Sequence, residues 1–218
     1  MVCLIGVPRL GGWPGWELFS RYCYWQILNT QFVMAINLQK GQRVNVGLSK
    51  VAVGLGWEPA VSGKEADLDA SVFMIGKNGK LPEDEFFVFY NNLQSPDGAV
   101  QHTGDVQSAS GDDDGEDEET LMVDLDKVDA RVEELIFVVT IHDASKAGQN
   151  FGQVKDAYIR VIDQGTGSEM MKYELSEDFS VETAVTIGRF YRRDKEWRFE
   201  AMGMGNRGGL GEYLGIYN

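Results

Sequence analysis

The residues of this chain best suited to chemistry are carboxylates, gathered in one segment between two strand-like runs. Seven of the eight residues from Asp112 to Glu119 are acidic, and the peptide His102-Thr103-Gly104-Asp105 lies shortly before them. So much negative charge beside a folded sheet is unfavourable unless a cation offsets it, and carboxylate oxygens suit hard cations such as Ca²⁺. Blocks of like charge are more often solvated and disordered. The segment therefore indicates either a cation site or a solvated acidic run.

Two features of the surrounding sequence favour a cation site. Gly104, Gly111 and Gly115 punctuate the acidic segment, and glycine lets the backbone turn so that several oxygens face one point. More acidic and amide residues stand near strand ends, at Asp67-Leu68-Asp69 and Asn91-Asn92. Because alternate residues of a strand point to the same face, Asp67 and Asp69 are expected together, with Leu68 turned inward.

The acidic segment does not form an EF-hand. Ser110, Asp112, Asp114 and Gly115 fit positions 1, 3, 5 and 6 of that loop, but position 12 falls on Leu121, where a bidentate glutamate is required. The flanking runs are also strand-like instead of helical. Oxygen-rich coordination of another kind stays open.

The two histidines, His102 and His142, allow a different metal chemistry. Two imidazoles and one carboxylate, from Asp105 or Asp143, would suit iron or zinc and could serve a metal-dependent hydrolase. The simpler interpretation is that His102 orders its loop by hydrogen bonding and that His142 ends the central strand. We favour it because the surrounding candidate ligands are hard oxygens.

Other catalytic chemistries find little support in the sequence. The Gly-x-Ser-x-Gly elbow of serine hydrolases is missing, and both cysteines, Cys3 and Cys23, precede Met34. Residues 203–208 spell G-x-G-x-x-G, but a dinucleotide site needs this motif inside a βαβ unit, with an acidic residue about 20 positions further on. We interpret it as a glycine turn before a last helix.

Composition limits the classes of partner. The formal net charge of −14 argues against a nucleic-acid-binding protein and against docking on anionic lipid, because both depend on Lys and Arg. No run of about 18 apolar residues predicts a transmembrane helix. With 218 residues and 43% hydrophobic content, the chain can bury one sizeable core.

Residues 1–33 differ from the rest of the chain. They hold three of the five tryptophans and both cysteines, with Arg9, Glu17 and Arg21 as their charged residues, and they lack the pattern of a signal peptide. Met34 is followed at once by a strand pattern. We therefore expect 1–33 to be an N-terminal extension, either a mis-assigned start or a disordered leader, and 34–218 to be the folded domain.

Short strand-like runs separated by turn signals dominate residues 36–202, which predicts a mainly β protein, an antiparallel β-sandwich with a few short helices. The continuously apolar run 135–139 predicts a central strand buried on both faces. The expected strands are Ile36–Leu38, Val44–Leu48, Val51–Trp57, Leu68–Ile75, Phe86–Tyr90, Leu121–Leu125, Leu135–Ile141, Ala157–Ile162, Met171–Leu175, Thr183–Tyr191 and Trp197–Met202. Helix candidates are Asp126–Leu135 (helix or turn), Phe151–Asp156 and Leu210–Ile216.

These motifs together resemble the TerD family of tellurium-resistance and general stress proteins. The resemblance covers 34–218, in order and in spacing, and in that family the chain begins where Met34 stands. The matching segments are Val53-Gly54-Leu55-Gly56-Trp57, Asp67-Leu68-Asp69-Ala70-Ser71, Phe89-Tyr90-Asn91-Asn92-Leu93, Ser95-Pro96-Asp97-Gly98, His102-Thr103-Gly104-Asp105, Phe137-Val138-Val139-Thr140-Ile141-His142-Asp143-Ala144 and Asn150-Phe151-Gly152-Gln153-Val154.

The resemblance implies a β-sandwich that binds Ca²⁺ in acidic loops at one end. The chain departs from the family at 106–110, where Val106-Gln107-Ser108-Ala109-Ser110 replaces the usual residues, and its acidic run is longer. We therefore give Asp67, Asp69 and Asp105 more weight than any carboxylate of 112–119. The metal ligands implied by position are Asp67, Asp69, Asn91, Asn92, Asp105, Asp114, Glu116, Asp117 and Glu118.

The resemblance further implies a non-enzymatic, cytoplasmic, Ca²⁺-binding protein of the stress response, associated with resistance to tellurite and to other toxic or oxidative stress. Its expected partners are Ca²⁺ and other tellurium-resistance proteins at the inner face of the membrane, without nucleic acid and without membrane insertion. One alternative is a metal-dependent hydrolase that uses the loop carboxylates with His102 and His142. Another is a plain β-sandwich interaction domain with a disordered acidic loop.

Overall fold

The computed structural model describes residues 35–58, 67–104, 117–175 and 179–218. One compact unit of the chain spans Met34–Asn218. The predictions about 1–33 fall outside the described residues and stay predictions.

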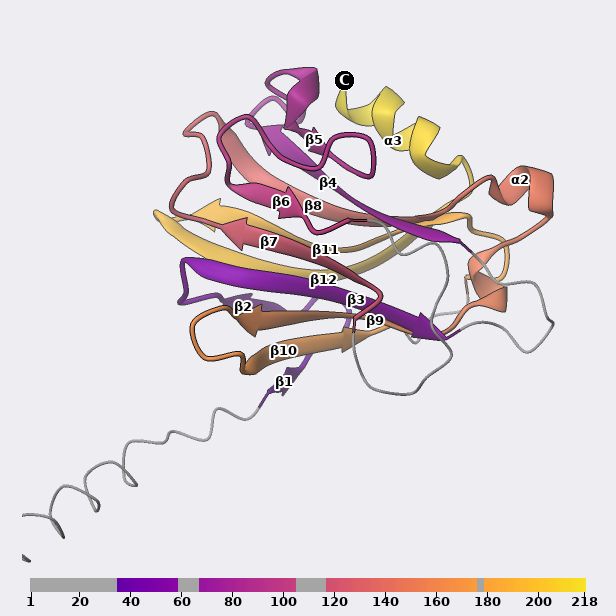
Figure 1. Cartoon of the computed structure of the whole chain (residues 1–218), viewed down its shortest axis with the longest axis horizontal. Helices are drawn as coiled ribbons and strands as arrows, with labels where there is room; N and C mark the ends of the chain where they lie inside the picture. The colour runs from indigo at the N-terminus through magenta and orange to yellow at the C-terminus, as the bar shows by residue number, and fades with distance from the viewer. Residues whose placement is uncertain (1–34, 59–66, 105–116, 176–178) are drawn as a thin grey trace, which may run out of the picture. The chain divides into compact units, whose positions relative to one another are not determined.

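Two sheets packed face to face form this unit (Figure 1). Within the described residues, sheet A has the strand order β1-β10-β9-β3-β7-β6 and sheet B the order β2-β12-β11-β8-β4-β5. Strands β1 and β10 pair in parallel, and the other neighbours pair antiparallel. The predicted antiparallel β-sandwich is thereby confirmed. The strands are β1 Ile36–Asn37, β2 Arg43–Asn45, β3 Lys50–Glu58, β4 Leu68–Gly76, β5 Phe87–Val88, β6 Val100–His102, β7 Glu119–Asp124, β8 Val132–Ile141, β9 Lys155–Asp163, β10 Glu169–Glu174, β11 Ala184–Arg193 and β12 Glu196–Asn206.

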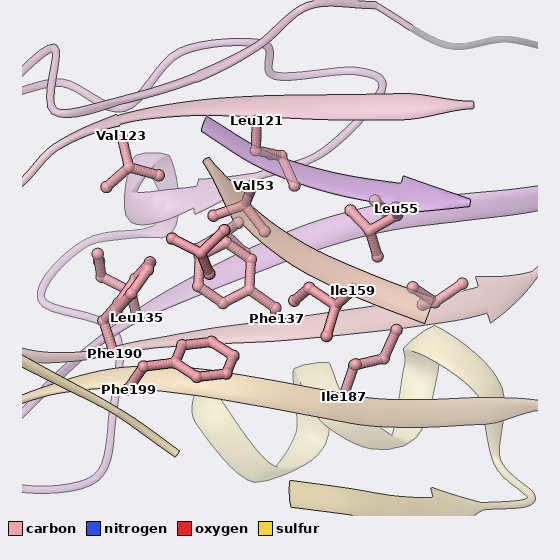
Figure 2. Close-up of a cluster of buried hydrophobic side chains, with 14 of the residues drawn as sticks. Val53, Leu55, Leu121, Val123, Leu135, Phe137, Ile159, Ile187, Phe190 and Phe199 are labelled. Atoms are coloured by element: carbon pink, nitrogen blue, oxygen red, sulfur yellow. The ribbon is translucent and has the colours of Figure 1, made fainter. Parts of the chain in front are cut away.

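Alternating side chains of the two sheets build the core. In β7 the buried residues are Glu119, Leu121 and Val123, each two positions from the next, so one face of that strand points inward. The labelled side chains from sheet A meet aromatic rings from sheet B, Phe137, Phe190 and others (Figure 2). The rings of Phe137 and Phe190 lie edge to face with centroids 5.4 Å apart, a favoured aromatic geometry.

The central strand β8 is buried on both faces, as its continuous apolar run predicted. Phe137 points into the sandwich, while Ile136 and Val138 belong to a second hydrophobic cluster on the outer face of sheet B. Helix α3 (Gly209–Tyr217) covers that face (Figure 1). The buried hydroxyl groups of its Tyr213 and of Thr186 lie 2.8 Å apart and share a hydrogen bond, so the last helix belongs to the folded domain.

The remaining short elements show where sequence patterns are weakest. The candidate helix Asp126–Leu135 is a turn followed by β8. The candidate helix Phe151–Asp156 is the 3₁₀ turn η2, Phe151–Gln153, followed by the first residues of β9. Strand β6, helix α2 (Ala144–Ala147) and the 3₁₀ turn η1 (Asp84–Phe86) were not predicted. Elements of three or four residues are too short to show a hydrophobic period.

The glycine-rich segment 203–208 has a structural explanation. Gly203 has φ +56° where the pairing of β11 with β12 shifts its register, a bulge that suits glycine. Strand β12 lies between β11 and β2 and pairs antiparallel with both, so the motif is not part of a βαβ unit. None of the helices in the described part of the chain has the length and hydropathy needed to cross a bilayer.

The fold predicts that a substitution at a buried position lowers the free energy of unfolding much more than one at an exposed position. Replacing the buried Phe137 with alanine should lower the free energy of unfolding by about 3–5 kcal/mol, because it removes an aromatic ring from between the two sheets and leaves a cavity. Chemical denaturation of the full chain would measure it. The control Leu93→Ala, at a position that is 45% exposed, should change it by less than about 0.5 kcal/mol. Equal losses would contradict the assignment of the core.

Candidate metal centre

The carboxylates of Asp67 and Asp69 stand at the start of β4. Leu68 between them is buried in the core, as predicted, so the side chain of Asp69 lies on the outer face of sheet B. Only 6% of Asp69 is exposed. In the ladder Asp69 pairs with Thr140 of β8, so the backbone that carries this carboxylate is held by the central strand.

His142 holds both aspartates in place, and β8 ends just before it, as predicted. Its backbone N–H donates to the Asp67 carbonyl over 2.7 Å, and its Nδ1–H donates to Asp69 Oδ2 over 3.1 Å. The hydrogen bond to Asp69 raises the pKa of His142, and the negative charges of Asp69 and Asp67 add to it. The ring of Tyr90 contacts the imidazole edge on, with centroids 6.0 Å apart. This end of β4 therefore carries one carboxylate held by an imidazole, with the backbone of a second aspartate tied to the same histidine.

Glu119, the first residue of β7, points into the sandwich. It is 2% exposed, and its Oε2 accepts a hydrogen bond of 2.6 Å from the backbone N–H of Ala70, in the other sheet. Burial raises the pKa of Glu119 to about 7, against the opposing effect of its hydrogen bonds. Sequence reasoning missed this residue. The signal was present, because Glu119 shares the alternation of Leu121 and Val123 and so had to face inward.

His102 lies beside Glu119 on the inner side of sheet A. Gly104 N–H donates to its Nδ1 over 3.1 Å, which confirms the predicted role of ordering the loop. That bond assigns the ring proton to Nε2, 3.5 Å from Glu119 Oε2. The imidazole is 2% exposed, so it faces the interior and not the outer face that carries Asp69 and His142.

The other predicted ligands are placed differently. Asn92 donates from Nδ2 to the carbonyls of Glu85 and Phe87 and so braces its own loop, whereas Asn91 is exposed. Asp117 forms an ion pair with Arg160 on the outer face of sheet A, and Glu118 next to it is partly buried. Asp105, Asp114 and Glu116 lie outside the described residues.

The donor atoms at the start of β4 fit a hard cation in their chemistry. Asp67 and Asp69 supply carboxylate oxygens, whereas Ca²⁺ takes six to eight oxygen ligands in all. Across the described ranges no three His, Cys, Asp or Glu side chains are arranged to hold an ion by themselves. A site that combines His102, His142 and Asp143 is therefore not formed by these residues, and a complete shell would need oxygens beyond Asp67 and Asp69.

Comparison with known proteins identifies relatives. The TerD domain family model matches residues 34–217. Tellurium resistance protein TerD of Serratia marcescens is 46% identical over 192 residues, which cover 84% of this chain and 97% of that protein. General stress protein 16U of Bacillus subtilis is 45% identical over 184 residues, 81% of this chain and 94% of that protein. These names describe tellurium resistance and stress response, and neither is an enzyme name.

A solved structure shows the same fold. It is a homologue of telluride resistance protein (TerD), SCO6318 from Streptomyces coelicolor A3(2), which superposes with a TM-score of 0.63 at 20% sequence identity. The match covers 77% of this chain and 96% of that one. At this level of identity the similarity establishes the arrangement of the two sheets only.

The buried carboxyl of Glu119 predicts a pH dependence of stability. Its pKa is raised from the ordinary 4.5 to about 7 in the fold, so folding favours the protonated form. That contribution is complete below about pH 4.5 and is lost as the pH rises through about 7. With chelator present, the free energy of unfolding should therefore fall between pH 5 and pH 8 by up to about 3 kcal/mol more than in Glu119→Gln.

Denaturation curves at several pH values would measure this difference. Glu174→Gln, at a glutamate whose side chain is 72% exposed, is the matched control and should keep the wild-type pH profile. Parallel profiles for the wild type and Glu119→Gln would show that this carboxyl group does not titrate as described.

Proposed function

Because the chain belongs to the TerD domain family, we propose that it is a non-enzymatic, Ca²⁺-binding protein of the cytoplasmic stress response. Its relatives support the stress-response part, since they are named as tellurium resistance and general stress proteins. The ion belongs to the proposal, and the observation that carries it is the placement of Asp67 and Asp69. His142 holds the Asp69 carboxylate through its ring and the Asp67 backbone through its own N–H, so both residues lie at one strand start.

The chain's own residues would do most of the positioning. Strand β4 sets the spacing of Asp67 and Asp69, and His142 fixes the orientation of the Asp69 carboxylate by holding one of its oxygens. A bound Ca²⁺ would neutralise the carboxylates that it joins and so order an end of the sandwich that otherwise repels itself. The resemblance implies that the remaining oxygen ligands would come from Asn91, Asp105, Asp114, Glu116 and Glu118.

The stress phenotype would follow from this ordering and from binding to other proteins. We propose other members of the tellurium-resistance family as partners, at the inner face of the membrane. Both cysteines of the chain precede Met34, so the domain has no thiol with which to reduce tellurite. Resistance would therefore be a phenotype of the cell and not a reaction of this protein. The hydrolase alternative gains no support, because His102 faces the interior of the sandwich.

Substitutions at β4 should separate a defined site from diffuse charge. Asp67→Ala and Asp69→Ala should each weaken Ca²⁺ binding by about tenfold or more, equivalent to about 1.4 kcal/mol, because each removes a proposed ligand. Asp113→Ala should have a much smaller effect. Calorimetric titration of the chelator-treated full chain would measure binding, with Mg²⁺ as the control ion and Asp69→Asn to keep the hydrogen bond with His142.

Wild-type binding is expected to saturate with a dissociation constant of about 10⁻⁷–10⁻⁵ M, the range of Ca²⁺ sensors. Equal effects of all three alanine substitutions would show that the acidic residues act only as diffuse charge. A titration without Ca²⁺ heat, or with an equal response to Mg²⁺, would refute the proposed site and leave a plain interaction domain.

Ca²⁺ should also stabilise the fold by mass action. At a free concentration 100 times the dissociation constant, the free energy of unfolding should rise by about 2.7 kcal/mol. Thermal unfolding in Ca²⁺ and in chelator would measure the rise. Asp69→Ala should reduce it to about 1.4 kcal/mol or less at the same Ca²⁺ concentration, because its affinity is at least about tenfold weaker. An unchanged melting temperature in the wild type would contradict preferential binding to the native state.

A further inference from the structure

The side chain of Asp117 is fixed to the outer face of sheet A. Its Oδ1 accepts a hydrogen bond of 2.7 Å from Arg160 Nε and one of 3.2 Å from the Tyr158 hydroxyl, both in β9. The carboxylate lies directly over Gly54 of β3, where a methyl group would overlap it. Its side chain is only 6% exposed. The lack of a side chain at position 54 thus allows the close approach of this carboxylate to the sheet.

Two residues later, the side chain of Glu119 lies on the opposite, inner face of the same sheet. Glu119 pairs with Leu55, the neighbour of Gly54, and sends its carboxylate inward to the Ala70 N–H. The segment 117–119 therefore contacts β3 on both faces of sheet A. The side chain of Asp117 lies on the outer face, and that of Glu119 lies on the inner face. We call this arrangement the β7 clasp. The residue that precedes Ala70 is Asp69. The hydrogen bond from Ala70 N–H to Glu119 therefore connects the clasp to the backbone next to a proposed metal ligand.

We infer that Asp117 is an anchor and not a metal ligand, and that Arg160 is a positioning residue for the ion site at Asp67 and Asp69. The inference rests on the proposed function for the ion and on geometry for the clasp. The carboxylate of Asp117 is nearly buried and already paired with a guanidinium group and a hydroxyl group. Its charge is therefore offset, and it is poorly accessible to a cation. Its pairing instead fixes the start of β7 and so the position of Glu119. Glu119 in turn holds the backbone N–H of Ala70, the residue next to Asp69.

The sharpest test moves Asp117 without changing any charge. Gly54 has no positive φ, so Gly54→Ala suits its backbone, and the added methyl group displaces the tip of Asp117. We expect Ca²⁺ affinity to fall by about tenfold, as for loss of an outer-shell partner. We also expect faster amide hydrogen exchange at 119–121 in chelator. Gly211→Ala, in open space on α3, is the matched control and should change neither quantity.

Charge variants then separate an anchor from a ligand. Arg160→Gln should also weaken Ca²⁺ binding and speed exchange at 119–121, and Arg160→Lys should partly restore both. Lys172→Gln removes a neighbouring cation, one that contacts the Tyr158 ring, and corrects for the change in net charge. If Asp117 were a ligand, Arg160→Gln would release it and strengthen binding beyond Lys172→Gln. That result would overturn the inference.

The two proposals fail in different ways. If the wild type binds no Ca²⁺, the proposed function fails and the positioning role falls with it. Hydrogen exchange in chelator still tests the clasp in that case. Faster exchange at 119–121 in Gly54→Ala and in Arg160→Gln, but not in their controls, supports the anchor. Unchanged exchange in both variants overturns it whatever the ion does.

Discussion

One hydrogen bond between the two sheets sets the geometry of the candidate centre, and it joins the carboxylate of Glu119 to the backbone N–H of Ala70. Strand β5 pairs with β4 only at Val72 and Phe73 among the described residues, so Ala70 lies beyond the end of that pairing. A buried N–H without an acceptor would be costly. Glu119 supplies the acceptor from the opposite sheet, although its own burial favours the protonated carboxyl.

The same end of the sandwich shows how a chain with a net charge of −14 distributes its carboxylates. The aspartates that approach the sheets each have a cationic or polar partner. Asp69 is held by His142, and Asp117 by Arg160 and Tyr158. Ion pairs with this little exposure have fixed geometry, unlike solvated surface pairs. The result is a set of carboxylates in fixed positions, of which Asp117 belongs to the acidic run 112–119.

Aromatic packing connects this end to the C-terminal helix. A row of ring contacts runs from α3 across the outer face of sheet B to the imidazole beside Asp69. Its members are Tyr217, Phe73, Phe87, Phe89, Tyr90 and His142, with successive centroids 5.0, 4.4, 4.4, 5.1 and 6.0 Å apart. Stacked and edge-on rings are close-packed and resist small displacements. The orientation of His142 is thus supported by the second hydrophobic cluster as well as by Asp69.

The sequence by itself determined the fold class, most of the strands and the inward position of Leu68 between Asp67 and Asp69, because alternation fixes which side chains share a face. It also indicated a buried central strand, since 135–139 carries no polar residue. Only the tertiary structure decided that Glu119 bridges the sheets, that His102 faces inward and that Asp117 lies over Gly54. The contacts of Glu119 with Ala70 and of Asp117 with Gly54 join residues that are 49 and 63 positions apart in the chain. No local pattern encodes such a contact, because it forms only when strands distant in the sequence pair and the two sheets pack.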